Sequence, residues 1–503
     1  MTRSRRRAVA LPLLVVALAT GLPATWFIWT LAKGHGDFAG GHVDTREFAT
    51  LQSYFQRRDD GLCDRIFVTA EDTWLVGVVD SPDSSMDLDG STDLAELIRG
   101  HDDGDNGGAA YGVFGAATGA RAKYGYISRL NDNGQFDVVA RLNSSACMAA
   151  GGPDGRRVYV LSGMERPDNA YDNDDPASRQ DAVFATADHG QSWQWQREGF
   201  MVPSSITAWG VRPYRDAYDT VWAWARLPRT QVTNGKPIVD GDGSGLYYST
   251  DEGRSTTEIV QTSPLVASRQ ELEALKPAGM KLNGEAVVGE VTPHVMRLGV
   301  DRAAVWVSQQ IGYSDPTDTS PYNAGALHLL RYAELSRSGD EWRMGDVEQN
   351  QGMEIQAMGQ GPDGRVRAVV RMAGETGSHI ARIDPASLEI KTAAKLPGAF
   401  APLTSSEYVR GFWVGKHSMV VNVGSSYRVP TWINAGEWLS GDEAHISGNA
   451  VFYSVDDGRS WDRLAIPGYQ GVLGFDAATD RLFWHKGGSY EDKSIQVDRL
   501  AED

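Results

Sequence analysis

The feature that most constrains this chain is a hairpin that recurs seven times. Each copy has a short apolar run, a tight turn rich in Asp or Gly, and a second apolar run, as in RIFVTAEDTWLVGVV at 65–79. Runs rich in Val, Trp and Tyr beside such turns are typical of paired β-strands. The other copies begin at 146, 205, 293, 354, 410 and 471. A repeat of this length predicts an array of similar small sheets.

A second hairpin follows most of the copies, and two hairpins make a four-stranded blade. These second hairpins lie at 123–142, 181–198, 245–261, 379–396 and 449–466. The pattern predicts an all-β fold, a seven-bladed β-propeller, with six or eight blades as alternatives. The last unit has three clear strands, so we expect its outer strand to come from the N-terminal side, within 45–55. A helix over the same residues is the alternative.

Several stretches interrupt the repeat and do not contribute to it. They are 80–122, 165–180, 228–244, 311–324 and 425–448. Recognition usually resides in loops that a rigid scaffold carries. Trp432 and Trp438 in the last of these stretches are therefore the aromatic residues that we expect at a binding surface, whereas tryptophans on the strands are expected in the core.

Three turns share the pattern Ser/Thr-x-Asp-x-Gly-x-Ser: TADHGQSW at 186–193, STDEGRST at 249–256 and SVDDGRSW at 454–461. An Asp side chain can accept N–H bonds from its own turn, Gly can adopt positive φ, and Trp can cover the hairpin. The pattern resembles the Asp-box, or BNR repeat, of the sialidase-like β-propellers. The resemblance implies a structural role for these residues, which are Asp188, Gly190, Trp193, Asp251, Gly253, Asp456, Gly458 and Trp461.

The same resemblance sets out what a sialidase would need. It implies three arginines for a substrate carboxylate, a Tyr and Glu pair as nucleophile and base, and an Asp acid/base. Arg65 stands in DRIFV, where the family has an Arg-Ile-Pro motif, and Phe67 replaces the proline. Tyr408 and Arg410, beside Glu407, imitate a Tyr and Arg element. We expect Arg65 and Arg410 to be ordinary strand residues, so the sequence predicts no assigned catalytic residue.

Other readable catalytic motifs are absent from the sequence. The chain has no HExxH, no GxSxG, no Walker loop and no GxGxxG in a βαβ setting. Whether the protein is an enzyme stays open, with the sequence favouring a non-enzyme and glycoside hydrolysis as the reaction otherwise. No cofactor is predicted, apart from a weak calcium alternative in SMDLDGSTDLAE. Its oxygen ligands would be Asp87, Asp89, Asp93 and Glu96.

The first 33 residues predict a membrane anchor. MTRSRRR precedes an uncharged run over 8–32, which is long enough to cross a bilayer, and the arginines should stay cytoplasmic. The alternative is a cleaved secretory signal that would release the protein. Both interpretations place the rest of the chain outside the cytoplasm. We therefore expect a basic stub and anchor at 1–33, a linker with the ring-closing strand at 34–58, and the propeller at 59–503.

The two cysteines are Cys63 and Cys147. Both lie near the start of the first strand of their hairpins, in adjacent repeats, at comparable distances before the turn. In an exported chain such a pair favours a disulfide that would tie the first blade to the second. Two free buried thiols are the alternative.

The net charge limits the kinds of molecule that the protein can bind. The formal net charge is −18, and because residues 1–33 hold five basic and no acidic residues, the remainder carries −23. A phosphate backbone needs a basic face, so nucleic acid is not expected. The sequence favours a membrane-anchored extracytoplasmic propeller that binds another protein, either in envelope complex assembly or in toxin-neutralising immunity, without catalysis. The alternative is a sialidase-like propeller that binds or hydrolyses glycans.

Overall fold

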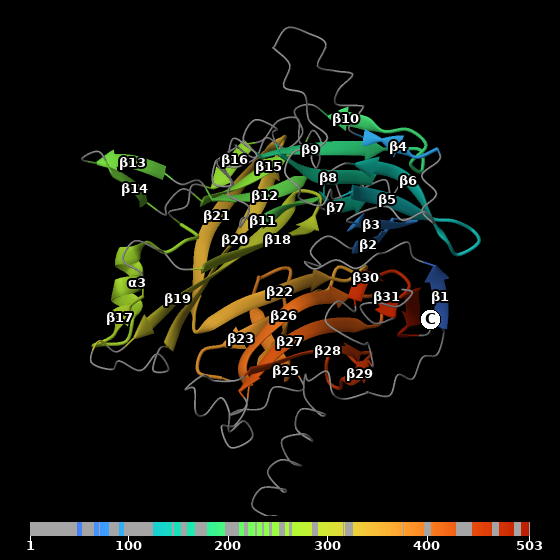
Figure 1. Cartoon of the computed structure of the whole chain (residues 1–503). Coiled ribbons are helices and arrows are strands. Elements are labelled where there is room, and N and C mark those ends of the chain that lie inside the picture. Colours follow the sequence, from blue (N-terminus) through green and yellow to red (C-terminus); the bar gives the residue numbers. More distant parts are fainter. Residues whose placement is uncertain are drawn as a thin grey trace, which may run out of the picture.

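The computed structural model is mostly β. It describes 48–52, 65–69, 71–79, 90–94, 124–142, 145–151, 158–165, 179–196, 211–215, 220–226, 229–233, 236–240, 244–250, 257–260, 264–283, 290–314, 316, 325–375, 377–396, 404–428, 445–464, 472–486 and 494–501. Within these residues, seven sheets of four or five strands follow one another around the molecule in chain order (Figure 1).

Each of the seven predicted first hairpins is confirmed as an antiparallel strand pair. The first three sheets contain these strands: β2 (Arg65–Val68), β3 (Thr73–Val79), β5 (Tyr124–Leu130), β6 (Phe136–Leu142) and β4 (Thr92–Asp93); β7 (Ser145–Gly151), β8 (Val158–Glu165), β9 (Arg179–Thr186) and β10 (Gln194–Gln196); β11 (Val211–Arg215), β12 (Val221–Arg226), β15 (Ser244–Ser249) and β16 (Thr257–Val260).

The remaining four sheets continue the same order from the first strand of each sheet to its edge. Their strands are β18 (Glu290–Gly299), β19 (Arg302–Ser314), β20 (Gly325–Ser338) and β21 (Glu341–Gln351), with β17 (Lys281–Leu282) beside β19; β22 (Met353–Gln360), β23 (Val366–Met372), β24 (Ser378–Ile383) and β25 (Ile390–Lys395); β26 (Thr404–Val414), β27 (Met419–Arg428), β28 (His445–Ser454) and β29 (Asp462–Leu464); β30 (Val472–Asp476), β31 (Arg481–Lys486), β32 (Ser494–Arg499) and β1 (Phe48–Gln52).

The seventh sheet joins the two ends of the chain. β1 pairs antiparallel with β32, so the outermost strand of this sheet comes from the N-terminal side. The innermost strand of the same sheet, β30, packs beside β2 of the first sheet. Ile66 and Leu75 share an apolar cluster with Leu473 and Phe483. The ring of sheets is closed by these contacts.

The contact between β2 and β30 depends on a glycine. A Cβ atom at position 474 would lie 2.0 Å from the backbone oxygen of Ile66. Two strands from the ends of the chain can approach this closely because Gly474 has no side chain.

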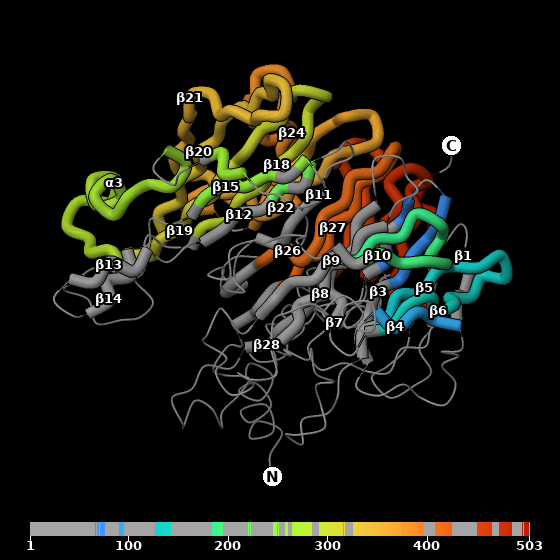
Figure 2. Tube along the Cα trace, turned by 90° about the horizontal axis from the view of Figure 1, so that it is seen from above, coloured from blue at the N-terminus to red at the C-terminus, as the bar shows by residue number. Residues whose placement is uncertain are grey.

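The fourth sheet is longer than the others and carries the one described α-helix. β19 has 13 residues and β20 has 14. Helix α3 (Arg269–Leu275) begins at Ser268 with a capping box to Glu271, and Leu272 packs into the apolar cluster of this sheet. Figures 1 and 2 both place α3 at one end of the molecule. A separate two-stranded hairpin of β13 (Arg229–Thr233) and β14 (Lys236–Asp240) lies in the connection from β12 to β15.

The helix segment is fixed to the sheet by buried polar side chains. Gln309 exchanges hydrogen bonds with the backbone of Ala267, at 2.8 and 3.0 Å. Arg331 donates to Glu271 at 2.8 Å and to the backbone oxygen of Pro264 at 3.3 Å. The hairpin repeat did not predict this covering segment, because its short helix interrupts the repeat.

The predicted consequence of ring closure concerns β1. A chain that starts at residue 54 loses β1 and leaves β32 as an open edge, whereas a control chain that starts at residue 47 keeps it. We expect the shorter chain to unfold at a lower temperature and to aggregate in proportion to its concentration, because unpaired strand edges associate. Differential scanning calorimetry with light scattering measures both effects. Equal unfolding temperatures would show that β1 does not stabilise the ring.

Candidate functional site

The connections between strands divide the molecule into two faces. Strand direction alternates in each sheet, so the joins from first to second strand and from third to fourth strand lie at one end, and the joins from second to third strand lie at the other. The short turns of neighbouring sheets touch: Arg365 Nη2 donates to Lys416 O at 2.8 Å, and Lys416 N donates to Ala477 O at 2.8 Å. We call this side the short-turn face and the opposite side the long-connection face.

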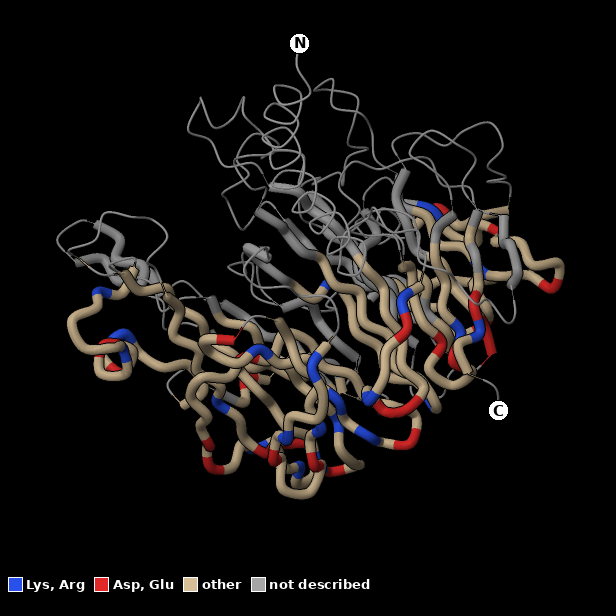
Figure 3. The backbone as a smooth tube through the Cα atoms, turned by 90° about the horizontal axis from the view of Figure 1, so that it is seen from below, with Lys and Arg blue, Asp and Glu red and all other residues tan. Residues whose placement is uncertain are grey.

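All five interrupting stretches connect the second and third strands of their sheets. They join β3 to β5, β8 to β9, β12 to β15, β19 to β20, and β27 to β28. Each therefore leaves its sheet on the long-connection face. The short-turn face carries tight turns on which basic and acidic residues are interspersed (Figure 3).

Two turns of the Asp-x-Gly-x-Ser pattern have the same hydrogen bonds. In the turn at 454–461, Asp456 Oδ1 accepts from Ser460 N at 2.8 Å and from Ser454 Oγ at 2.9 Å. Trp461 Nε1 donates to Gly458 O at 3.1 Å. The turn at 186–193 repeats each bond with Asp188, Ser192, Thr186, Trp193 and Gly190. Both glycines have φ near +82°, a conformation that side-chain-bearing residues rarely adopt.

The aspartates of these turns are held as carboxylates. Hydrogen bonds from the Ser460 hydroxyl and backbone lower the pKa of Asp456 to about 2. Burial raises the pKa of Asp188, but the bonds from Ser192 and Thr186 outweigh this effect and the pKa is lowered. A carboxylate whose lone pairs are occupied by its own turn is unsuited to proton transfer, which agrees with a structural role.

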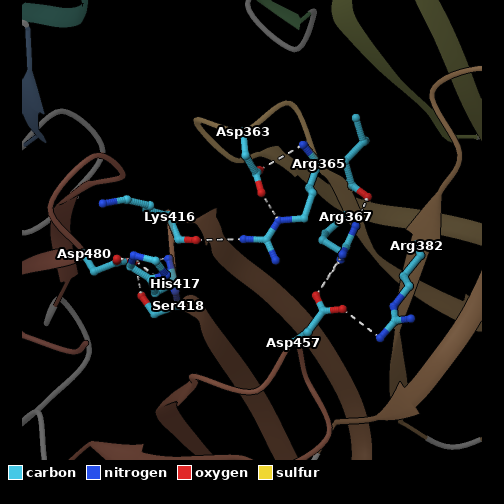
Figure 4. Close-up of polar contacts among 10 residues, drawn as sticks. Asp363, Arg365, Arg367, Arg382, Lys416, His417, Ser418, Asp457 and Asp480 are labelled. Carbon is cyan, nitrogen blue, oxygen red and sulfur yellow. Dashed lines mark hydrogen bonds and ion pairs between the residues drawn. The ribbon is translucent and has the colours of Figure 1, made fainter. Parts of the chain in front are cut away.

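The residue after each aspartate reaches the preceding sheet. Asp457 has φ +62°, and its carboxylate contacts Arg367 Nη2 at 2.9 Å and Arg382 Nη2 at 2.7 Å (Figure 4). His189 occupies the same position in its turn with φ +60°, and its Nδ1 lies 2.6 Å from Asp72 Oδ2. The two turns therefore hold neighbouring sheets together, one through a carboxylate that contacts guanidinium groups and the other through an imidazole that contacts a carboxylate.

Asp480 forms a third link on the short-turn face, between the sixth and seventh sheets. Its carboxylate is buried and accepts from Ser418 N at 2.9 Å, from Ser418 Oγ at 2.7 Å and from His417 N at 3.0 Å. Figure 4 shows this group beside Lys416, and Arg365 lies between it and the Asp457 cluster. The sequence analysis did not single out Asp480. The only sequence signal for it was an Asp at a hairpin joint.

A buried polar cluster lies toward the long-connection face, at the junction of the fourth and fifth sheets. Glu354 Oε2, near the start of β22, lies 3.0 Å from His328 Nδ1 and 3.9 Å from Arg371 Nη1. His294 also lies here, partly buried, with Nε2 3.3 Å from Ile355 O. Burial lowers the pKa of His294 to about 4. Sequence motifs did not reveal this cluster, because its members come from four different strands.

The structure brings together Tyr408 and Arg410, both on β26. Arg410 Nη2 donates to the phenol oxygen of Tyr408 at 2.7 Å. Arg65 lies at the start of β2. Among the described residues, no group of three or more His, Cys, Asp and Glu side chains is arranged to hold a metal ion.

The other predicted site residues fall largely outside the described ranges. Asp93 lies in β4, which pairs parallel with β6. Cys147 lies in β7. The predicted residues outside the described part of the chain are Cys63, Asp87, Asp89, Glu96, Asp251, Gly253, Trp432 and Trp438. The disulfide, the calcium site and the tryptophan-bearing loop remain predictions.

Comparison with known proteins gives no family assignment. No protein-family profile matches the chain, and no curated protein matches it. In the structured part of the chain, no helix is long and apolar enough to cross a membrane.

Solved structures give similarities of low TM-score. A puromycin hydrolase matches with a TM-score of 0.41 at 11% identity, covering 88% of this chain and 53% of the hydrolase. An oligogalacturonate lyase in complex with manganese matches with a TM-score of 0.38 at 9% identity, covering 90% and 99%. The calcium-binding protein regucalcin from Agrobacterium tumefaciens matches with a TM-score of 0.28 at 10% identity, covering 71% and 91%. This chain spans about half the length of the puromycin hydrolase and prolyl endopeptidase chains that it matches.

Removing the contact between Asp457 and Arg367 should destabilise the protein more than removing the contact between His189 and Asp72. Asp457→Ala leaves Arg367 buried without its carboxylate, so we expect the free energy of unfolding to fall by about 3 kcal/mol. His189→Ala is the matched change in the equivalent turn, where the His side chain is 39% exposed, and should cost less than about 1 kcal/mol. Urea unfolding measures both. Equal losses would contradict the importance of the buried pair.

The lowered pKa of His294 leads us to expect a loss of stability in acid. An unfolded His has a pKa of about 6.5, so between pH 6.5 and 4 the unfolded state binds more protons and the free energy of unfolding falls as pH falls. We expect His294→Gln to remove up to about 3 kcal/mol of this pH dependence. Urea midpoints at pH 7 and pH 4.5 test it. The exposed His417→Gln is the control and should keep the wild-type slope, and an unchanged slope for His294→Gln would refute the expectation.

Proposed function

We propose that the seven sheets are the blades of a seven-bladed β-propeller that is anchored in a membrane, lies outside the cytoplasm and binds another protein. The observation that carries the proposal is the division into two faces. The short turns are joined by buried side chains and ion pairs, whereas all five interrupting stretches leave from the opposite face. A rigid ring with its variable connections on one side is suited to recognition.

The same division argues against a catalytic role for the acidic residues of the short-turn face. Asp456 accepts hydrogen bonds from its own turn, and Asp457 and Asp480 bind groups on a neighbouring sheet. On the other side, Glu354 lies against His328 and Arg371 in a junction between sheets. The proposed protein therefore acts as a scaffold, in envelope complex assembly or as an immunity-type neutraliser of a toxin, without catalysis of its own.

A second candidate function is glycan binding by the long-connection face. The specific observation in its favour is the contact between Tyr408 and Arg410, which places an exposed ring and a guanidinium together in the first strand of the sixth sheet. The resemblance of the turns to sialidase-like propellers points the same way.

Capture from membranes tests the protein-binding proposal. The tagged full-length chain is compared with a variant whose connection over 430–443 is replaced by a short Gly-Ser link. We expect the wild type to retain a defined partner and the shortened variant to lose it, because the connection leaves from the long-connection face. The urea midpoint of the shortened variant should stay unchanged.

The control for this capture carries a charge reversal on the opposite face. Glu389→Lys combined with Lys391→Glu exchanges an exposed ion pair on the short-turn face and should keep the partner. The proposal would be overturned if the wild type, the shortened variant and the control all retained the same proteins. It would also be overturned if the shortened variant and the control lost the partner to the same extent.

A further inference from the structure

Tyr408 is the one large aromatic side chain that is exposed among the described residues. It is 40% exposed, and the other exposed large apolar residues are Val300 and Val455, which lie in short turns. Tyr408 lies on β26, six residues before the strand ends at Val414, and therefore toward the long-connection face. An aromatic ring at such a place needs an explanation other than core packing.

The ring of Tyr408 is held flat against the neighbouring strand. Tyr408 pairs with Gly424 on β27, and a Cβ atom at position 424 would lie 2.4 Å from Tyr408 Cζ. The ring therefore occupies the space that a side chain at Gly424 would fill. Arg410 fixes the ring at its polar end, with Nη2 2.7 Å from the phenol oxygen and Cζ 5.1 Å from the ring centroid. The orientation of the ring is thus set before any ligand arrives.

Arg410 reaches this position because β26 is irregular there. The pairing with β27 shifts between Val409 and Gly411, so Arg410 is the extra residue of a β-bulge. A bulge of this kind redirects a side chain and is common next to binding sites. The corresponding shift in β22, between Ile355 and Ala357, leaves Gln356 in the same place, where its Oε1 accepts from Ser378 Oγ at 2.6 Å.

Asn422 adds an acceptor on the same side of the sheet. It stands two residues before Gly424 on β27, and residues two apart in a strand point to one face. Its side chain is buried, with 8% of the residue exposed, and its Oδ1 has no hydrogen-bond partner among the described residues. A buried amide oxygen of this kind is costly unless a donor reaches it.

We propose that Tyr408, Arg410, Asn422 and Gly424 form a binding subsite for one pyranose ring of a carbohydrate, which we call the Tyr408 shelf. The part of the Tyr408 ring that stays exposed would stack on the C–H face of the sugar. Arg410 would donate to a sugar oxygen, and Asn422 Oδ1 would accept from a sugar hydroxyl. The inference rests on the glycan-binding candidate and is independent of the protein partner.

Other ligands fit this set less well. A proline-rich segment stacks on aromatic rings but offers only carbonyl acceptors at its prolines, which leaves Asn422 without a donor. A carboxylate or phosphate would place negative charge beside the Asn422 oxygen, and the single guanidinium already donates to the phenol. A sugar hydroxyl both donates and accepts, so it satisfies the two polar groups together.

Sugar titrations test the shelf on the full chain, held in a detergent without a sugar headgroup. Glucose, galactose, mannose and N-acetylglucosamine are titrated singly at millimolar concentration, with saturation-transfer NMR as the readout. We expect at least one pyranose to bind. Tyr408→Ala should weaken its binding at least about tenfold, and Tyr408→Phe, which keeps the ring, should stay within about threefold of wild type.

Two further variants probe the polar groups of the shelf, and a third variant serves as the matched control. Arg410→Met and Asn422→Ala should each weaken binding about fivefold. Tyr313 lies over Gly325 in the fourth sheet in the same manner, with its Cζ 2.3 Å from a Cβ at that glycine, so Tyr313→Ala should leave sugar binding unchanged.

The outcomes separate the shelf from the functions proposed above. Sugar binding that survives in Tyr408→Ala would refute the shelf and leave the glycan candidate standing. Wild-type protein that binds none of the four sugars would refute both the shelf and the glycan candidate. Neither result bears on the protein partner, whose capture depends on the connection over 430–443.

Discussion

Closure of the ring is the constraint on which the rest of the structure depends. Each sheet has an apolar face on either side and buries it only against a neighbour, so an open row would leave two faces in water. The chain avoids this at the contact between β2 and β30, where Gly474 lets the strands meet, and at β1, which covers the edge of β32. Both contacts join residues from opposite ends of the sequence.

Polar contacts on the short-turn face then fix how neighbouring sheets are set against one another. The Asp-x-Gly-x-Ser turns satisfy their own hydrogen bonds and place the residue after the aspartate, His189 or Asp457, against the preceding sheet. Asp480 links the sixth and seventh sheets from a different kind of turn, because its carboxylate accepts a hydrogen bond from Ser418 N. Apolar packing is non-directional, whereas these bonds specify position. The face that carries them is rigid, and the opposite face can vary its connections.

The Glu354 cluster and the Tyr408 shelf both lie toward that opposite face, yet they differ in character. Glu354, His328 and His294 lie between two sheets, where His328 is buried and the other two are partly buried, and desolvation keeps His294 neutral at physiological pH with a lowered pKa. Tyr408 is exposed, with the Arg410 guanidinium over its ring and bonded to its phenol oxygen. Enclosed ionisable groups couple stability to pH, while an exposed ring held in one orientation can meet a ligand without losing freedom.

The sequence by itself determined the hairpins, because a strand pair and its turn are local and leave a period-two pattern with Asp and Gly at the joint. It also determined that Asp188 and Asp456 serve their own turns, since a side chain bonding its own backbone needs no distant partner. Only the tertiary structure decided that Asp457 meets Arg367, that Glu354 meets His328, and that Tyr408 lies over Gly424. These contacts depend on bulges, strand register and the packing of separate sheets, which no local pattern encodes.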